Sequence, residues 1–125
     1  MLRDKALKYI DDNSEKIVDL LKQITEVPAP TGDEGRRSEF IEQYLENAGA
    51  VGVYRDKEGN VVYPYGIRRG RNNAVMIGNM DTVFSKDTEL EVTEKDGKLL
   101  CPGIGDDTAN VACLLLLAAF AAKEK

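Results

Sequence analysis

The feature that most constrains this chain is an unbroken apolar run over residues 111–122, which holds only Val, Ala, Cys, Leu and Phe. A helix that is apolar on every face is normally buried on every face. The run is shorter than the roughly 20 residues that a membrane-spanning helix needs. A chain of 125 residues does not easily enclose such a helix near its end. We therefore expect a piece of a larger protein or a partner subunit, including a homo-oligomer formed through residues 109–122.

Composition and charge exclude several functional classes. The chain has 22 acidic and 17 basic residues, and its only basic cluster covers residues 68–71, so a nucleic-acid partner is not expected. It contains no histidine, which excludes histidine triads and histidine ligands within the chain. Cys101 and Cys113 lack a metal-type spacing and are interpreted as reduced thiols. With a charged start and no signal-peptide core, we expect a cytoplasmic protein without membrane association.

Three helices are predicted in the first half of the chain. Apolar residues at helical spacing predict helices over residues 2–11 and from Ser14 to the proline-containing stretch 27–30, where proline ends the second helix. Thr31 and Glu34 fit a capping box, with Thr31 as N-cap of a helix that runs to about residue 48.

The second half of the chain is predicted to form strands and a final helix. Two hairpins are expected, 51–55 with 60–65 and 89–93 with 98–101, because each pair flanks a turn signal. The apolar run 74–78 predicts a strand that is covered on both faces. A helix follows from about residue 107 to 123. The fold class expected is α/β, a three-layer sandwich with a mixed β-sheet on 74–78, in one domain over 1–125.

Two stretches carry the candidate chemistry. The first contains Gly103, Gly105, Asp106 and Asp107 directly before the last helix. A carboxylate there can simply cap the helix, but two glycines permit a close backbone approach and a second acid is redundant for capping. Paired acids are costly unless a cation lies nearby. Both a cap and a metal site therefore remain open.

The second stretch is the polar end of the predicted 74–78 strand. Asn79 and Asp81 follow Gly78, which allows a bend or a close approach. Asn and Asp at this position are ordinarily turn formers. Polar groups at a strand end that face a carboxylate at a helix start are also a common way to build a site on an α/β scaffold.

Taken in order, these motifs resemble those of a family of co-catalytic zinc hydrolases. The family includes acetylornithine deacetylase, succinyl-diaminopimelate desuccinylase, aminoacylase and glutamate carboxypeptidase. The resemblance covers nearly all of the chain, and its motif around Asp81 is similar to the family's His-x-Asp-Thr-Val motif. The stretches that carry it are residues 27–35, 56–62, 77–84, 94–99 and 102–107.

The resemblance implies roles for individual residues. Asp106 matches the aspartate that bridges two zinc ions, and Asp81 matches the aspartate that orients a ligand histidine. Gly103, Gly105 and Asp107 then have structural roles around the bridging residue. A cis peptide after the bridging aspartate is also implied, here between Asp106 and Asp107. In the full-length family two zinc ions activate a water and a glutamate takes its proton, cleaving peptides or N-acyl amino acids.

The chain departs from the family in ways that affect this expectation. Asn79 stands in the position of the ligand histidine, and an amide is a poor zinc ligand. The general-base glutamate, further ligands and the lid or dimerisation domain are not among these 125 residues. The resemblance therefore implies an incomplete zinc-exopeptidase-like catalytic domain. We expect the isolated chain to be inactive and to bind zinc weakly or not at all. The alternative is a non-catalytic relic or interaction module that self-associates through its apolar helix.

Overall fold

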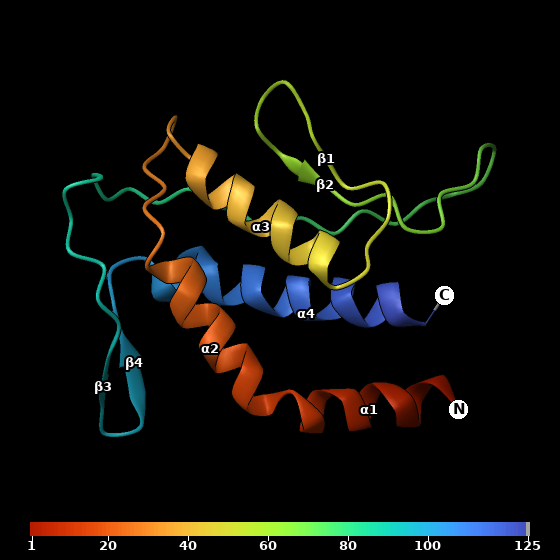
Figure 1. The fold of residues 1–125 in the computed structure, drawn as a ribbon, viewed down its shortest axis with the longest axis horizontal. Helices are drawn as coiled ribbons and strands as arrows, with labels where there is room; N and C mark the ends of the chain where they lie inside the picture. Colours follow the sequence, from red (N-terminus) through yellow and green to blue (C-terminus); the bar gives the residue numbers. More distant parts are fainter. Residues whose placement is uncertain (125) are drawn as a thin grey trace.

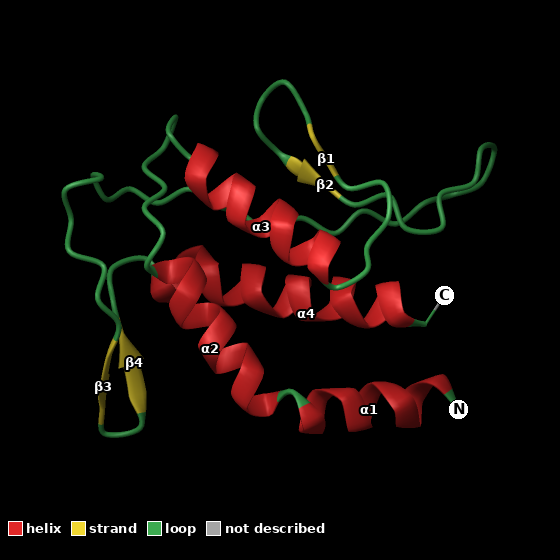
Figure 2. Ribbon diagram, viewed as in Figure 1, coloured by secondary structure: helices red, strands yellow, loops and turns green. Residues whose placement is uncertain are grey.

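The computed structural model describes residues 1–124, in which helices and two small sheets are mixed (Figures 1 and 2). Its helical elements are α1 (Leu2–Asp12), α2 (Ser14–Thr25), α3 (Gly35–Asn47), the short π-type turn η1 (Ile104–Thr108) and α4 (Ala109–Lys123). Its strands are β1 (Tyr54–Arg55), β2 (Val61–Val62), β3 (Thr93–Lys95) and β4 (Lys98–Leu100). The composition of elements agrees with an α/β class.

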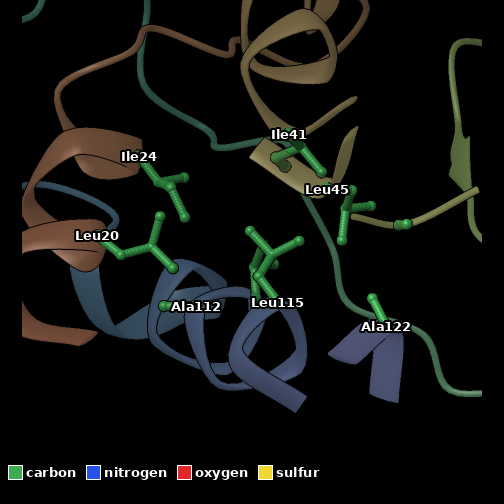
Figure 3. Close-up of a cluster of buried hydrophobic side chains, with 9 residues drawn as sticks. Leu20, Ile24, Ile41, Leu45, Ala112, Leu115 and Ala122 are labelled. Atoms are coloured by element: carbon green, nitrogen blue, oxygen red, sulfur yellow. The ribbon is translucent and has the colours of Figure 1, made fainter. Parts of the chain in front are cut away.

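The core lies where α2, α3 and α4 meet. In Figure 1, α4 runs between α3 on one side and the α1–α2 pair on the other. Figure 3 shows side chains from the three helices pointing toward one another. Apolar side chains removed from water supply the main stabilisation of such a core. The buried members of this cluster are Leu20, Ile24, Ile41, Leu45, Ala50, Val111, Ala112, Leu115 and Ala122.

Within the described chain the apolar helix is buried on one face only, which agrees with the expectation that 125 residues do not easily enclose it. Val111 and Leu115 lie in the core, whereas Cys113 is exposed and Leu117 is 46% exposed. Helix α1 passes along this outer side without burying any residue of its own. Tyr9 and Phe120 contact each other there, with ring centroids 5.1 Å apart. The outer face of α4 therefore remains partly open to solvent.

Ile104–Lys123 is the one described stretch that could cross a membrane by length and composition. A core helix of a soluble protein meets the same criterion. The regular part, α4, has 15 residues and is about 22 Å long at 1.5 Å per residue. That is shorter than a hydrocarbon core of about 30 Å. Since α4 also packs on α2 and α3, we interpret it as a core helix.

Both predicted hairpins form, but the strands are shorter than expected. In the second hairpin β3 also lies further along the chain than the predicted strand 89–93, because Glu94 and Lys95 pair in the strand and only Asp96 and Gly97 form the turn. β1 pairs with β2 and β3 pairs with β4, each pair antiparallel. The β3–β4 loop contains only Asp96 and Gly97, both at positive φ, which is the backbone of a two-residue hairpin turn. The two hairpins belong to separate two-stranded sheets.

The strand predicted over residues 74–78 is not formed in the described structure, and no mixed sheet is built on it. The chain runs there without turn or bend but lies beside no other strand. Val75 is 80% exposed and Ile77 is 87% exposed. An apolar run predicts burial, but a strand also requires a neighbour that accepts and donates its backbone hydrogen bonds. The described residues provide no such neighbour.

The capping box predicted at Thr31 is also wrong. Helix α3 begins at Gly35 with Glu34 as its N-cap, and no side chain caps it. Glu34 instead accepts a hydrogen bond from the Gly32 amide at 2.6 Å. Thr31 is held by pairing with Thr82, whose carbonyl accepts the Thr31 amide at 3.2 Å. Thr31 therefore bonds to Thr82, which is distant in sequence, and does not cap the helix as the local sequence pattern predicted.

The turn between β1 and β2 depends on Asp56, and replacing Asp56 with alanine should loosen this hairpin. Its Oδ1 accepts the amides of Glu58 and Asn60, and its Oδ2 accepts the Asn60 side-chain amide, each at 2.9 Å. These bonds lower the pKa of Asp56 below its usual 3.8, and the bond from the Asn60 side chain has the largest effect. A lowered pKa in the folded state means that the stabilisation is present above about pH 4 and is lost as the pH falls below it.

Amide hydrogen exchange at Asn60 tests this prediction. Asp56→Ala should reduce the protection factor at neutral pH, and the difference from wild type should disappear in acid. Glu58→Ala is the matched control, because its exposed carboxylate contacts only the Lys57 ammonium, at 3.7 Å. Equal effects of the two substitutions at neutral pH would show that Asp56 does not organise the turn.

Candidate functional site

The two stretches singled out in the sequence meet in the structure, together with a third. Thr82 donates its amide to the Ala29 carbonyl at 2.8 Å, and the two segments form a parallel bridge between Pro30 and Thr82. On the other side, the turn that begins at Gly103 lies against Thr82. The loop before α3, residues 79–82 and the turn before α4 therefore converge on one place.

Gly103 brings the last of these segments into contact. Its φ is +79°, in the left-handed region that glycine adopts at little cost. A Cβ built on it would lie 2.9 Å from Thr82 Cγ2, closer than side chains tolerate. Gly105 differs, because a Cβ there would meet nothing within 4 Å. Of the two glycines expected to permit a close approach, Gly103 is the one that makes it.

Asp107 joins the two candidate stretches directly. Its Oδ2 accepts the backbone amide of Asn79 at 2.9 Å, and its Oδ1 accepts the side-chain amide of Asn110. These two bonds lower the pKa of Asp107, and the bond from the Asn79 amide has the larger effect. The peptide between Asp106 and Asp107 is cis, as the resemblance implied. Both Asp107 oxygens are thus occupied by protein donors.

The other two acids point to different surroundings. Asp106 is exposed, and its carboxylate has no hydrogen bond or ion pair within residues 1–124. Asp81 is half-buried and accepts a hydrogen bond from the Thr31 hydroxyl. Asn79 uses its backbone amide for Asp107 and leaves its side chain exposed. Asp106 and Asn79 are therefore the groups of this set that remain open to an incoming ligand.

Arg37 of α3 is the residue that the sequence analysis missed. It is 2% exposed, and its guanidinium is surrounded by acceptors from three segments. Nη1 donates to the Met80 carbonyl at 2.9 Å and to Thr108 Oγ1 at 3.3 Å, while Nη2 donates to the Val27 carbonyl at 2.7 Å. Thr108 in turn donates to the Gly103 carbonyl at 2.9 Å.

The position of Arg37 follows from helical spacing. It lies four residues before Ile41 and eight before Leu45, which are both buried, so the three share one face of α3. A cation on the apolar stripe of a helix was the available signal. Burial lowers the pKa of Arg37, and the negative charge of Asp81 partly offsets this effect. Through these hydrogen bonds the buried arginine connects the three segments of the candidate site, which contain Val27, Met80 and Thr108.

The residues present do not fit a zinc ion. No group of three or more His, Cys, Asp or Glu side chains lies close enough to hold a metal within residues 1–124. Asp107 is already satisfied by two donors, which leaves the Asp106 carboxylate and the neutral Asn79 amide. A protein zinc site ordinarily has three or four N, S or O ligands. These residues by themselves therefore support no zinc-dependent catalytic step.

One hollow on the described surface is lined in part by Cys101 and Pro102, which directly precede Gly103 in the sequence. It has a volume of about 390 Å³ and does not include Asn79, Asp81, Asp106 or Asp107. Burial and the charge of Glu26 raise the pKa of Cys101, so this thiol stays protonated near neutral pH. Cys101 is therefore not an activated nucleophile. Its lining residues are Glu89, Glu91, Thr93, Leu100, Cys101 and Pro102.

Comparison with known proteins supports a relation to hydrolases for part of the chain. No protein-family model matches the sequence. Over 67 residues, 53% of this chain, it is 37% identical to a protein of Pyrococcus abyssi provisionally named LysW-lysine/LysW-ornithine hydrolase. Proteins of the same name match over 72 residues, 57% of this chain, with 32% identity in Pyrococcus furiosus and 35% in Thermococcus kodakarensis.

These matches cover only a small part of the relatives. The matched stretch spans 19% of the Pyrococcus abyssi protein, 21% of the Pyrococcus furiosus protein and 20% of the Thermococcus kodakarensis protein. About half of the chain is thus similar to proteins named as hydrolases. The names concern those proteins over their full length.

Proposed function

We propose that these residues form one part of a hydrolase of acylated amino acids or peptides, within the acetylornithine deacetylase-like family of zinc hydrolases. The observation that carries the proposal is that residues 79–82 and the turn over residues 103–108 lie together and are joined by the hydrogen bond from the Asn79 amide to Asp107. The serial order of motifs and the partial similarity to named hydrolases support the same conclusion. A three-layer sandwich is proposed for the longer hydrolase.

Each site residue has a proposed role in that longer protein. Asp106 is the exposed carboxylate that would reach a metal, and Asn79 occupies the neighbouring ligand position. Asp81, held by Thr31, would orient a neighbouring group. Arg37 and Gly103 fix the backbone on which these side chains stand. By analogy with the names of the relatives, amino acids linked to LysW are the first substrates to try, followed by N-acyl amino acids.

The proposal predicts an inactive isolated chain. Incubated with zinc and N-acyl amino acids or dipeptides, the 125-residue protein should release no amino acid above the buffer rate. The reason is the small donor set, in which one free carboxylate and one amide cannot complete a four-coordinate site. A ninhydrin or mass-spectrometric assay measures the release. Zinc-dependent turnover would show that the chain is catalytically complete.

A zinc titration of two variants tests the proposed ligand position. Asn79→His should bind zinc at least about tenfold more tightly than wild type, a gain of about 1.4 kcal/mol, because imidazole is a far better ligand than an amide. Asn110→His is the matched control, since Asn110 also contacts Asp107 but is not in the proposed ligand position. An equal gain in both variants, or none in Asn79→His, would contradict the assignment of Asn79.

A second candidate function is self-association through the apolar helix, residues 109–122. One observation favours it: an apolar groove of about 280 Å³ runs between the first two helices and the outer face of α4. Leu117 is 46% exposed beside it. In this case the chain would be an interaction module without catalysis. The groove is lined by Ala6, Tyr9, Ile10, Ile17, Cys113, Leu116, Leu117 and Phe120.

A further inference from the structure

Two sets of hydrogen bonds connect the two candidate stretches, and they involve neighbouring residues. In the first, the Asn79 amide donates to Asp107 Oδ2 at 2.9 Å. In the second, Arg37 Nη1 donates to the Met80 carbonyl at 2.9 Å and to Thr108 Oγ1 at 3.3 Å. Met80 follows Asn79 in the sequence, and Thr108 follows Asp107. One arginine nitrogen therefore contacts the residue next to each partner of the first bond.

The direction of each bond in the second set is fixed by the chemistry of its groups. A guanidinium donates and a carbonyl accepts, so Thr108 Oγ1 accepts from Arg37 and donates its single proton to the Gly103 carbonyl at 2.9 Å. Thr108 is 1% exposed and Arg37 is 2% exposed. Because residues 1–124 already enclose both side chains, these bonds do not depend on what lies against the outer surface of the chain.

The hydroxyl of Thr108 acts on both parts of the candidate site at once. Its bond to the Gly103 carbonyl spans the turn that contains Asp106. Its bond from Arg37 Nη1 fixes this turn relative to Met80 and hence relative to Asn79. A buried donor or acceptor without a partner carries its full desolvation cost, so the arrangement of these groups is strongly preferred over a looser one.

We propose that Thr108 is a positioning residue, whose hydroxyl holds the turn that presents Asp106 at a fixed separation from Asn79. The role rests on the proposed function, because there Asp106 and Asn79 are the groups that face a ligand. Thr108 acts through Arg37 and Gly103. The side chain required at this position is therefore one that can donate and accept a hydrogen bond in a closely packed place.

Amide hydrogen exchange of the whole chain tests the role of the hydroxyl. The measured quantity is the exchange rate of the Asn79 amide divided by that of the Leu115 amide in the core of α4, a ratio that cancels a general loss of stability. Thr108→Val keeps the branched shape but removes both bonds, so this ratio should rise at least about tenfold. Thr108→Ser keeps the hydroxyl, and its ratio should stay within about threefold of wild type.

Thr25→Val is the matched control, because it also removes the hydroxyl of a fully buried threonine. The Thr25 hydroxyl donates to the Leu21 carbonyl at 2.7 Å, within α2. Its backbone carbonyl accepts Arg37 Nη2 at 3.4 Å, and a side-chain substitution leaves this carbonyl in place. The exchange ratio of Asn79 to Leu115 in this control should stay within about threefold of wild type.

Three results of the exchange experiment would each overturn the positioning role. An unchanged ratio in Thr108→Val would show that the Asn79 bond does not need the hydroxyl. An equal rise in Thr25→Val would indicate general loosening, and an equal rise in Thr108→Ser would assign the effect to the methyl group. If circular dichroism shows that Thr108→Val does not fold, Thr108→Cys takes its place, because a thiol bonds only weakly; its ratio should then exceed that of Thr108→Ser.

A zinc titration separates the positioning role from the proposed function. In the Asn79→His background, adding Thr108→Val should raise the zinc dissociation constant at least about threefold, whereas adding Thr25→Val should not. Equal affinity with and without the Thr108 hydroxyl, in a chain that does bind zinc, would overturn the positioning role alone. An Asn79→His chain without any gain in zinc affinity would contradict the proposed ligand position, and the exchange ratios would then decide the role of Thr108.

Discussion

Replacing Arg37 with methionine should lower the free energy of unfolding by about 3–5 kcal/mol. Methionine fills much of the space of the arginine stem but donates no hydrogen bond. The partly buried carbonyls of Val27 and Met80, and the buried hydroxyl of Thr108, would lose the donors they have now. A buried acceptor without a partner carries its full desolvation cost, which exceeds the net gain from the bond itself. Urea denaturation followed by circular dichroism measures the change.

Two further variants separate the role of the planar, multiply donating guanidinium of Arg37 from the effect of its positive charge. Arg36→Met removes the neighbouring, exposed arginine and should change stability by no more than about 0.5 kcal/mol. Arg37→Lys keeps the positive charge but presents a single ammonium in place of the planar fork, so its loss should fall between the two. If Arg37→Lys were as stable as wild type, charge alone would explain the role of this residue.

The loss at Arg37 should also appear locally. The arginine donates to residues on both sides of the Thr82–Ala29 contact, whose amide bond measures 2.8 Å. In a variant that still folds, the Thr82 amide should therefore exchange with solvent faster than the core amides of α4. Equal changes at both places would indicate a general loss of stability in place of release of the loops.

Elements with a local cause could be predicted from the sequence. Helical spacing and proline placed the first helices within a few residues of their observed ends. The Asp96–Gly97 pair marks a hairpin because both residues adopt positive φ with little strain. The meeting of the two stretches was expected from the arrangement of sites on α/β scaffolds and from the resemblance. The particular bond between Asn79 and Asp107, which are 28 positions apart in sequence, was not predicted.

Elements with a long-range cause could not be predicted in this way. The run 74–78 has the composition of a buried strand. A strand forms only where a neighbouring strand pairs with its backbone, and the composition of one segment does not show whether that neighbour is present. Thr31 has the pattern of an N-cap, but its amide and hydroxyl are used by residues 81 and 82. Arg37 was overlooked because a cation on a helix is ordinarily solvated, although its spacing from Ile41 placed it on the buried face.

Gly103→Ala should be the most disruptive single-methyl change at the candidate site, with a loss of about 2–4 kcal/mol. Two costs add. An alanine at φ +79° adopts the left-handed region that glycine alone enters freely. Its Cβ would also lie 2.9 Å from Thr82 Cγ2. Thr82 is buried and bonded through its amide to Ala29, so it cannot easily move aside.

Gly105→Ala is the matched control, two residues along the same turn. Its φ is not in the positive range, and a Cβ there meets no atom within 4 Å, so its loss should be below about 1 kcal/mol. Thermal unfolding of the two variants and wild type gives both values. The Asn79 amide should also lose protection in Gly103→Ala, because moving the turn away from Thr82 pulls Asp107 from its donor. Similar stability of the two variants would mean that the turn does not need this close approach, and the candidate site would then lack a fixed frame.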